Sequence, residues 1–177
     1  MMKRMVSVAL MIALALMCAA CGAKEAPAAS EGPVALEGFP WSVELRAAAV
    51  QEALHTAAGM KQYDGSVLDV AYDDEPTAGN VYLILTLTVA KTEAGGGSFD
   101  WSNLSVRDAD GGSYARMADD AFIQNHTYNR MPGTTLQIGE NKGSICFEIP
   151  ADAAKGDLTL VYDAGDAGEI AIAVKPE

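Results

Sequence analysis

Basic residues and histidine are scarce in this chain. Its 177 residues include 12 Lys and Arg against 24 Asp and Glu, and only two histidines, His55 and His126. Binding to nucleic acid and electrostatic attraction to anionic lipid both need an excess of Lys and Arg, so the composition argues against both. An acidic surface is typical of a soluble domain, and a cation or a basic partner is the alternative explanation for it.

The chain also lacks an apolar run long enough to cross a bilayer. Its N-terminal run, Val6–Met17, has twelve residues and is too short for a hydrocarbon core of about 30 Å. Lys3 and Arg4 precede this run and small residues follow it, which is the pattern of a secretion signal. With Cys21 at its end, the segment resembles a bacterial lipoprotein signal, which implies that residues 1–20 are removed and Cys21 carries the lipid. Ordinary secretion and an uncleaved anchor are the alternatives.

Cysteine is too rare to hold the fold together. The chain has three cysteines, of which Cys18 leaves with the signal and Cys21 is used by the lipid. Cys146 is then alone, so no intramolecular disulfide can form and the fold depends on its hydrophobic core. Only two histidines could activate a thiolate, so we expect Cys146 to be a small packing residue in a strand.

The remaining composition divides the chain into three parts. Residues 1–20 are the signal peptide, and residues 21–38 are the lipidated cysteine and a flexible tether of Ala, Pro, Gly, Ser and Glu. As a flexible coil this tether reaches roughly 20–25 Å. Residues 39–177 form one domain, since the 157 residues left after the signal are enough for a single core.

Residues 80–91 give the clearest structural signal. Alternating positions from Val81 to Val89 are apolar, and β-branched and aromatic residues fill the positions between them, as in a central strand covered on both faces. Shorter strands are expected at 67–72, 99–107, 113–115, 135–138, 143–149, 158–162 and 170–174. About eight strands with no helix pair between them predict two packed antiparallel sheets.

Two segments are less regular. Residues 42–54 fit both a helical stripe and a strand alternation. The alanines favour a helix on propensity alone, but the strongly β sequence that follows favours a strand. Residues 116–134 lack periodicity, with a short helical possibility around 119–125.

Several of these strands together carry a family resemblance. In order they are the run from Asn80 to Val89, Leu104 to Gly111, Leu136 to Glu140, Gly143-Ser-Ile-Cys-Phe-Glu-Ile-Pro150, and Leu158 to Tyr162. This order is similar to the telokin-like, immunoglobulin-fold domain of unknown function found in many bacterial lipoproteins. The resemblance covers about residues 42–174 and implies an all-β, immunoglobulin-like sandwich, a strand at 42–54 and a surface lipoprotein. It implies no active site.

The sequence offers little catalytic chemistry. It has no Ser/His/Asp set of definable geometry, no Gly-rich loop opening a helix and no Cys-x-x-Cys, so we predict neither an enzyme nor a cofactor. The alternative is extracytoplasmic copper binding, because His55 and Met60 share the spacing of His126 and Met131. Imidazole and thioether groups suit copper(I).

The irregular segment 116–134 is the predicted contact surface. Aromatic, Met and Arg residues are enriched in protein interfaces, and this segment is rich in them, with Arg116 and Met117 at its start. The candidate contact residues are Phe122, His126, Tyr128, Arg130 and Met131. Packing over the sandwich edge would explain the same residues. We therefore predict a non-enzymatic binding or adaptor domain, held at the membrane by its lipid, with another envelope protein as its partner.

Overall fold

A computed structural model describes residues 32–93, 98–132 and 139–176. The signal peptide, Cys21 and most of the tether lie outside the described residues, as does the strand expected at 135–138. In the described part of the chain, no helix is long and apolar enough to cross a membrane.

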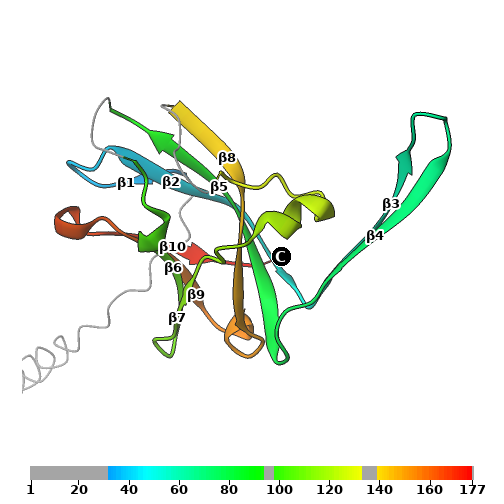
Figure 1. Ribbon diagram of the computed structural model, residues 1–177. Coiled ribbons are helices and arrows are strands. Elements are labelled where there is room, and N and C mark those ends of the chain that lie inside the picture. Colours follow the sequence, from blue (N-terminus) through cyan, green and yellow to red (C-terminus); the bar gives the residue numbers. More distant parts are fainter. Residues whose placement is uncertain (1–31, 94–97, 133–138, 177) are drawn as a thin grey trace, which may run out of the picture.

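The fold is an antiparallel β-sandwich with a separate two-stranded hairpin, as Figure 1 shows. One sheet has the order β1-β2-β5-β8 and the other has the order β10-β9-β6-β7, while β3 pairs with β4. The strands are β1 (Val34–Ala35), β2 (Trp41–Gln51), β3 (Leu54–Lys61), β4 (Val67–Asp74), β5 (Asn80–Lys91), β6 (Leu104–Asp108), β7 (Ser113–Ala115), β8 (Gly139–Pro150), β9 (Leu158–Asp163) and β10 (Glu169–Val174). The predicted all-β sandwich is confirmed.

Four short 3₁₀ helices lie between strands in the described residues. They are η1 (Trp101–Asn103), η2 (Ala121–His126), η3 (Ala153–Lys155) and η4 (Gly165–Ala167). The longest, η2, falls where the sequence indicated a short helix, and Thr127 ends it in the left-handed conformation, with φ of 69°.

Strand β5 is central, as its alternation predicted. It pairs with β2 on one side and β8 on the other, both antiparallel. Its odd-numbered residues from Val81 to Val89 are at most 5% exposed and face the main core between the two sheets. Trp41, Phe99 and Phe147 complete that core with the apolar residues of β9 and β10.

The opposite face of β5 is covered by the segment 116–131. Tyr82 and Ile84 of β5 pack with Cys146 of β8 and Ile123 of η2 in a second cluster. The segment also bonds to the edge of β8: Met117 N–H donates to the Cys146 carbonyl at 2.9 Å, and Met131 N–H donates to the Ser144 carbonyl at 2.8 Å. An exposed strand edge invites pairing with another chain, so this segment protects β8.

The N-terminal part of the domain agrees with one sequence expectation, the strand at 42–54, which ends at Gln51, and departs from another. Residues 42–51 are strand, within β2, because pairing with β5 outweighs the helix propensity of the three alanines at 47–49. The tether ends earlier than Gly38, since Val34 and Ala35 already pair with Val43 and Ser42. Two paired residues at the sheet edge were too few to detect in a stretch rich in Ala and Pro.

Cys146 is the packing residue that the sequence predicted. Its side chain is fully buried in β8, and burial raises the pKa of the thiol from 9.0 to about 12. We expect Cys146 to resist iodoacetamide at pH 8 in the folded protein, because only the thiolate reacts, and to be alkylated once urea unfolds the chain. Mass spectrometry of the Cys146 peptide measures this directly.

The same burial gives stability a pH dependence. The folded pKa of the Cys146 thiol lies above that of the unfolded thiol. The contribution of this thiol to the free energy of unfolding is therefore intact below pH 9.0 and is lost as the pH rises toward about 12.

Rapid alkylation of Cys146 at pH 8 without denaturant would contradict its burial.

Candidate functional site

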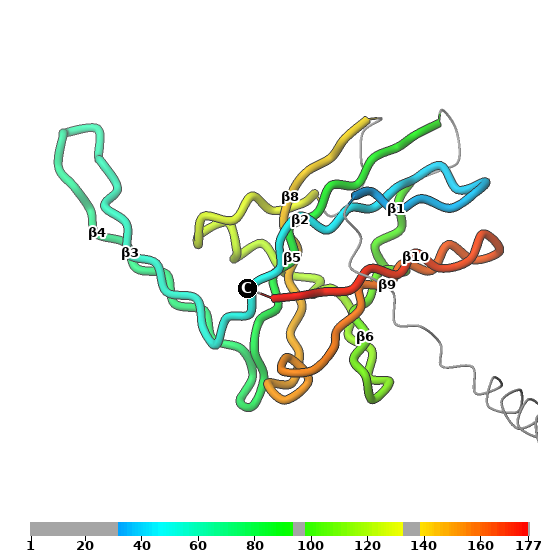
Figure 2. The backbone as a smooth tube through the Cα atoms, turned by 180° about the vertical axis from the view of Figure 1, so that it is seen from behind, coloured from blue at the N-terminus to red at the C-terminus, as the bar shows by residue number. Residues whose placement is uncertain are grey.

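The hairpin formed by β3 and β4 projects away from the sandwich as an arm. Figures 1 and 2 show it from opposite sides, and in both it extends clear of the two sheets. Among the described residues, β3 and β4 pair only with each other, from Leu54 opposite Asp74 to Lys61 opposite Val67. Both outer edges of the arm are therefore open to another strand.

Large apolar side chains gather at the far end of this arm. Four of them are at least half exposed: Met60, Tyr63, Val67 and Leu68. They lie in or beside a turn in which Gln62 N–H donates to the Ser66 carbonyl and Gly65 N–H donates to the Gln62 carbonyl. Gly65 has a φ of 86° in this turn. We call these four residues the arm tip. Single exposed apolar residues are ordinary on a surface, but a cluster on a projecting element is typical of an interaction site.

The residues around the arm tip are mildly acidic overall. Lys61 is accompanied by Asp64 and Asp69. Ser66 donates to the Asp64 carboxylate from both its hydroxyl and its backbone N–H, which lowers the pKa of Asp64. Asp64 therefore serves the turn and remains charged at neutral pH.

His126 fastens the base of the arm to the sandwich. Its side chain is 2% exposed, and its two ring nitrogens bond to the two strands of the arm: Nδ1 to Thr56 Oγ1 at 2.9 Å, and Nε2 to Asp74 Oδ2 at 2.8 Å. Tyr72 makes a T-shaped contact with the imidazole, with ring centroids 6.4 Å apart. One side chain of η2 thus holds both β3 and β4.

The order hydroxyl, imidazole, carboxylate also occurs in hydrolases, but the geometry differs here. In the serine hydrolase triad Nε2 faces the hydroxyl and Nδ1 faces the carboxylate. In this protein the ring is reversed and lies inside the packed base of the arm. We interpret these hydrogen bonds as structural contacts that link η2 to β3 and β4.

Replacing His126 with Ala should loosen the base of the arm. Two side-chain hydrogen bonds are lost, each worth about 0.5–1.5 kcal/mol, so backbone amides of β3 and β4 near Thr56 and Asp74 should exchange roughly ten-fold faster or more. Hydrogen–deuterium exchange of these amides is the measurement.

The control for this change is His55→Ala. His55 also bonds to an aspartate of the arm, Asp73, but both side chains are more than half exposed, and an exposed pair contributes about 0–1 kcal/mol. Equal exchange in the two variants would show that His126 does not hold the arm.

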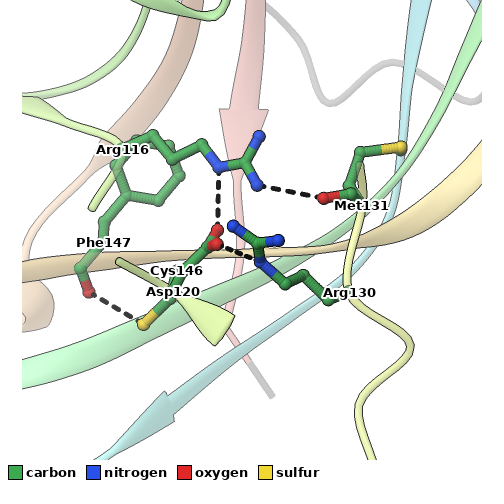
Figure 3. Close-up of polar contacts among 6 residues, drawn as sticks. All are labelled: Arg116, Asp120, Arg130, Met131, Cys146 and Phe147. Atoms are coloured by element: carbon green, nitrogen blue, oxygen red, sulfur yellow. Dashed lines mark hydrogen bonds and ion pairs between the residues drawn. The ribbon is translucent and has the colours of Figure 1, made fainter. Parts of the chain in front are cut away.

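A second feature lies in the segment 116–131: the buried carboxylate of Asp120, bound by two arginines (Figure 3). Asp120 is completely buried. Arg116 Nε donates to its Oδ2 at 2.7 Å, and Arg130 Nε donates to its Oδ1. Arg116 Nη2 also donates to the Met131 carbonyl at 3.1 Å. These contacts link residues at the two ends of the segment 116–131 to one another. The backbone hydrogen bonds of Met117 and Met131 hold the segment against β8.

The predicted contact surface is therefore arranged differently from the expectation. His126 and Met131 are buried, in the base of the arm and in the main core, so neither is available to a partner. Phe122 and Tyr128 are half-buried against the second cluster, and Arg130 is partly exposed beside Asp120. The exposed large apolar side chains in the described residues are those of the arm tip. The sequence did not indicate this surface, because β3 has no strong alternation of apolar and polar residues.

The structure does not gather the four residues of the copper hypothesis. Met60 is at the arm tip, His55 is bonded to Asp73 on the outside of the arm, and Met131 is in the main core. Within residues 32–93, 98–132 and 139–176, no group of three or more His, Cys, Asp or Glu is placed to hold a metal ion.

Comparison with known proteins shows the fold and no more. No protein-family model matches the chain, and no curated protein matches it significantly. The yjhA protein of Bacillus subtilis is similar in structure, with a TM-score of 0.51 and 16% identity over 85% of this chain and 100% of that protein. A conserved hypothetical protein of Bacillus anthracis gives a TM-score of 0.51 and 10% identity over 80% of this chain and 94% of its own.

A candidate lipoprotein of Bacillus subtilis, ycdA, has a TM-score of 0.48 and 10% identity over 84% of this chain, which spans 39% of that protein. At these identities the chain is classed as an antiparallel β-sandwich protein by its fold alone.

Proposed function

We propose that this chain is a lipid-anchored extracytoplasmic protein whose immunoglobulin-like sandwich carries the β3–β4 arm as a binding element for another envelope protein. The observation that carries the proposal is the arm tip: exposed apolar side chains at the end of a hairpin whose two edges are open. The lipid anchor is supported by the N-terminal segment that ends at Cys21. The immunoglobulin-like class is supported by two four-stranded antiparallel sheets packed on one core.

A protein suits the arm better than a lipid surface does. The unpaired backbone groups of an open strand edge cannot be satisfied in hydrocarbon, whereas a strand from a partner satisfies them. Asp64 and Asp69 near the tip would also oppose an anionic membrane. Strand addition supplies backbone hydrogen bonds, and the arm tip supplies apolar contacts.

The orientation of the arm relative to the sandwich is also fixed at its base, which favours binding. His126 bonds both strands at their base, so the arm does not have to be ordered when the partner arrives. Ordering a free hairpin would cost conformational entropy and weaken the complex.

Substituting the arm tip should abolish partner capture without unfolding the sandwich. The test variant carries Met60→Ser, Tyr63→Ser, Val67→Thr and Leu68→Ser, and the control carries Lys61→Ser and Asp69→Ser, two exposed polar residues at the same end. Tagged full-length proteins are crosslinked in intact cells and the captured proteins are identified by mass spectrometry. We expect one partner with the native chain and the control, and none with the test variant.

Two results would contradict the proposal. The same partner captured by the test variant would place binding elsewhere, and capture of a second copy of this chain alone would make the arm a self-association element. A Cys21→Ala form tests the anchor separately, since we expect it to leave the membrane fraction. Retention of that form in the membrane would remove the lipid from the account.

A further inference from the structure

A small pocket opens beside the two arginines that bind Asp120. Its volume is about 190 Å³, and its walls are Trp101, Ser102, Arg116, Met117, Ala118 and Arg130. Pockets for drug-sized ligands measure about 300–1,000 Å³, so this pocket suits a smaller molecule. The pocket therefore combines the apolar side chains of Trp101 and Met117 with the positively charged side chains of Arg116 and Arg130.

Arg116 lines this pocket and has one donor that is not used. Its side chain is 7% exposed, and its Nε and Nη2 are bonded to Asp120 and to the Met131 carbonyl. Its Nη1 is buried, and no hydrogen-bond partner for it occurs among the described residues. The guanidinium carbon lies 4.5 Å from the centroid of the Trp101 ring, so the indole packs against this cation. A buried charged donor without an acceptor costs free energy that a bound anion would recover.

The charges beside the pocket point to a monovalent anion. Arg116 and Arg130 share the single carboxylate of Asp120, which leaves one positive charge in excess within this group. The chain as a whole is strongly acidic, with 24 acidic against 12 basic residues, so this excess is a local feature. A carboxylate would neutralise it and match the planar guanidinium.

We propose that this pocket binds a small organic acid with one carboxylate and a compact apolar body. The carboxylate pairs with the Arg116 guanidinium, whose Nη1 has no partner among the described residues, and Arg130 contributes the second positive charge. The body of the ligand contacts the ring of Trp101 and the side chain of Met117. This site is independent of the arm and of its protein partner.

Benzoate is the probe, with acetate and inorganic phosphate as comparators. In a ¹H–¹⁵N spectrum of the full chain, benzoate should shift the indole resonance of Trp101 saturably, while that of Trp41, which is buried in the main core, stays in place. Acetate should bind more weakly, because it lacks the body that contacts Trp101. Stronger binding of phosphate than of benzoate would overturn the assignment to a carboxylate.

Three variants locate the site. Arg116→Gln should weaken benzoate binding at least ten-fold. Ala118→Trp should do the same by filling the pocket while leaving the ion pairs of Asp120 intact, which keeps the test valid if Arg116→Gln fails to fold. Arg107→Gln is the control, because it removes one arginine from an exposed pair with Glu169 and should bind benzoate as the native chain does. Native affinity in Ala118→Trp, or no saturable shift of Trp101, would overturn the proposal.

Discussion

Replacing Asp120 with Ala should lower the free energy of unfolding by about 3–5 kcal/mol, the cost of breaking a buried ion pair by removing one partner. Asp120 is completely buried, and its carboxylate accepts from Arg116 and from Arg130. Without it, two guanidinium groups remain beside each other, and the Arg116 side chain is 7% exposed. Urea unfolding followed by circular dichroism measures the change, with the expectation that the segment 116–131 detaches from β8.

The control for this prediction is Glu169→Gln. Glu169 also receives two hydrogen bonds from an arginine, Arg107, but both side chains are more than 40% exposed. Exposed pairs are typically worth about 0–1 kcal/mol, so this variant should be nearly as stable as the native protein. A similar loss in both variants would show that burial is not what makes Asp120 important.

Gly143→Ala should destabilise the protein by about 1–3 kcal/mol, because the added methyl group has no room. A Cβ at this position in β8 would lie 2.7 Å from the backbone N and Cα of Met131 and 2.9 Å from the Asn129 carbonyl oxygen. These are backbone atoms, which cannot rotate away as a side chain would. The segment 116–131 must therefore shift from the edge of β8, and equilibrium unfolding in urea measures the cost.

Gly156→Ala is the matched control for Gly143→Ala. Its Cβ would meet only the Ala153 carbonyl oxygen, at 3.6 Å, which is an ordinary contact. We expect a change within about 0.5 kcal/mol, as for most surface substitutions. If Gly143→Ala were tolerated equally well, the close approach of Met131 to β8 would not be a tight constraint on the fold.

Both predictions concern the way the protein treats its strand edges. The edge of β8 is closed by the segment 116–131, which Asp120 and its arginines hold in shape. The edges of β3 and β4 are left open within the described part of the chain, and the arm tip adds apolar side chains. Natural proteins usually protect such edges. The two open strand edges of the arm, together with the exposed apolar side chains of the arm tip, therefore support a binding role.

Much of the sandwich could be predicted because its strands depend on local patterns. The alternation from Val81 to Val89 identified β5 as central, and the apolar run at 143–149 identified most of β8. Cys146 was recognised as a packing residue by its place in that run. These signals depend on burial of both faces of a strand, which the sequence records directly.

The arm and the candidate sites depend on contacts between distant residues. β3 includes Ala57, Ala58 and Gly59 and forms only by pairing with β4, so its sequence carries little strand preference. His126 was predicted to lie in a contact surface because the segment 116–134 is rich in residues typical of interfaces. Its partners Thr56 and Asp74 lie 70 and 52 positions away, so the sequence does not indicate them. Asp120 likewise resembles any acidic loop residue until Arg130 is brought beside it.

Site-specific photocrosslinking in intact cells tests the proposed role of the arm most directly. A photoreactive side chain is placed at Leu68 in the arm tip, at exposed Gln124 in the segment 116–131, or at exposed Asp166 in η4. We predict a discrete adduct with one envelope protein from position 68 and none from positions 124 and 166. An adduct from position 124 alone would return the contact surface to the segment 116–131, and equal or absent adducts at all three positions would contradict a binding role for the arm.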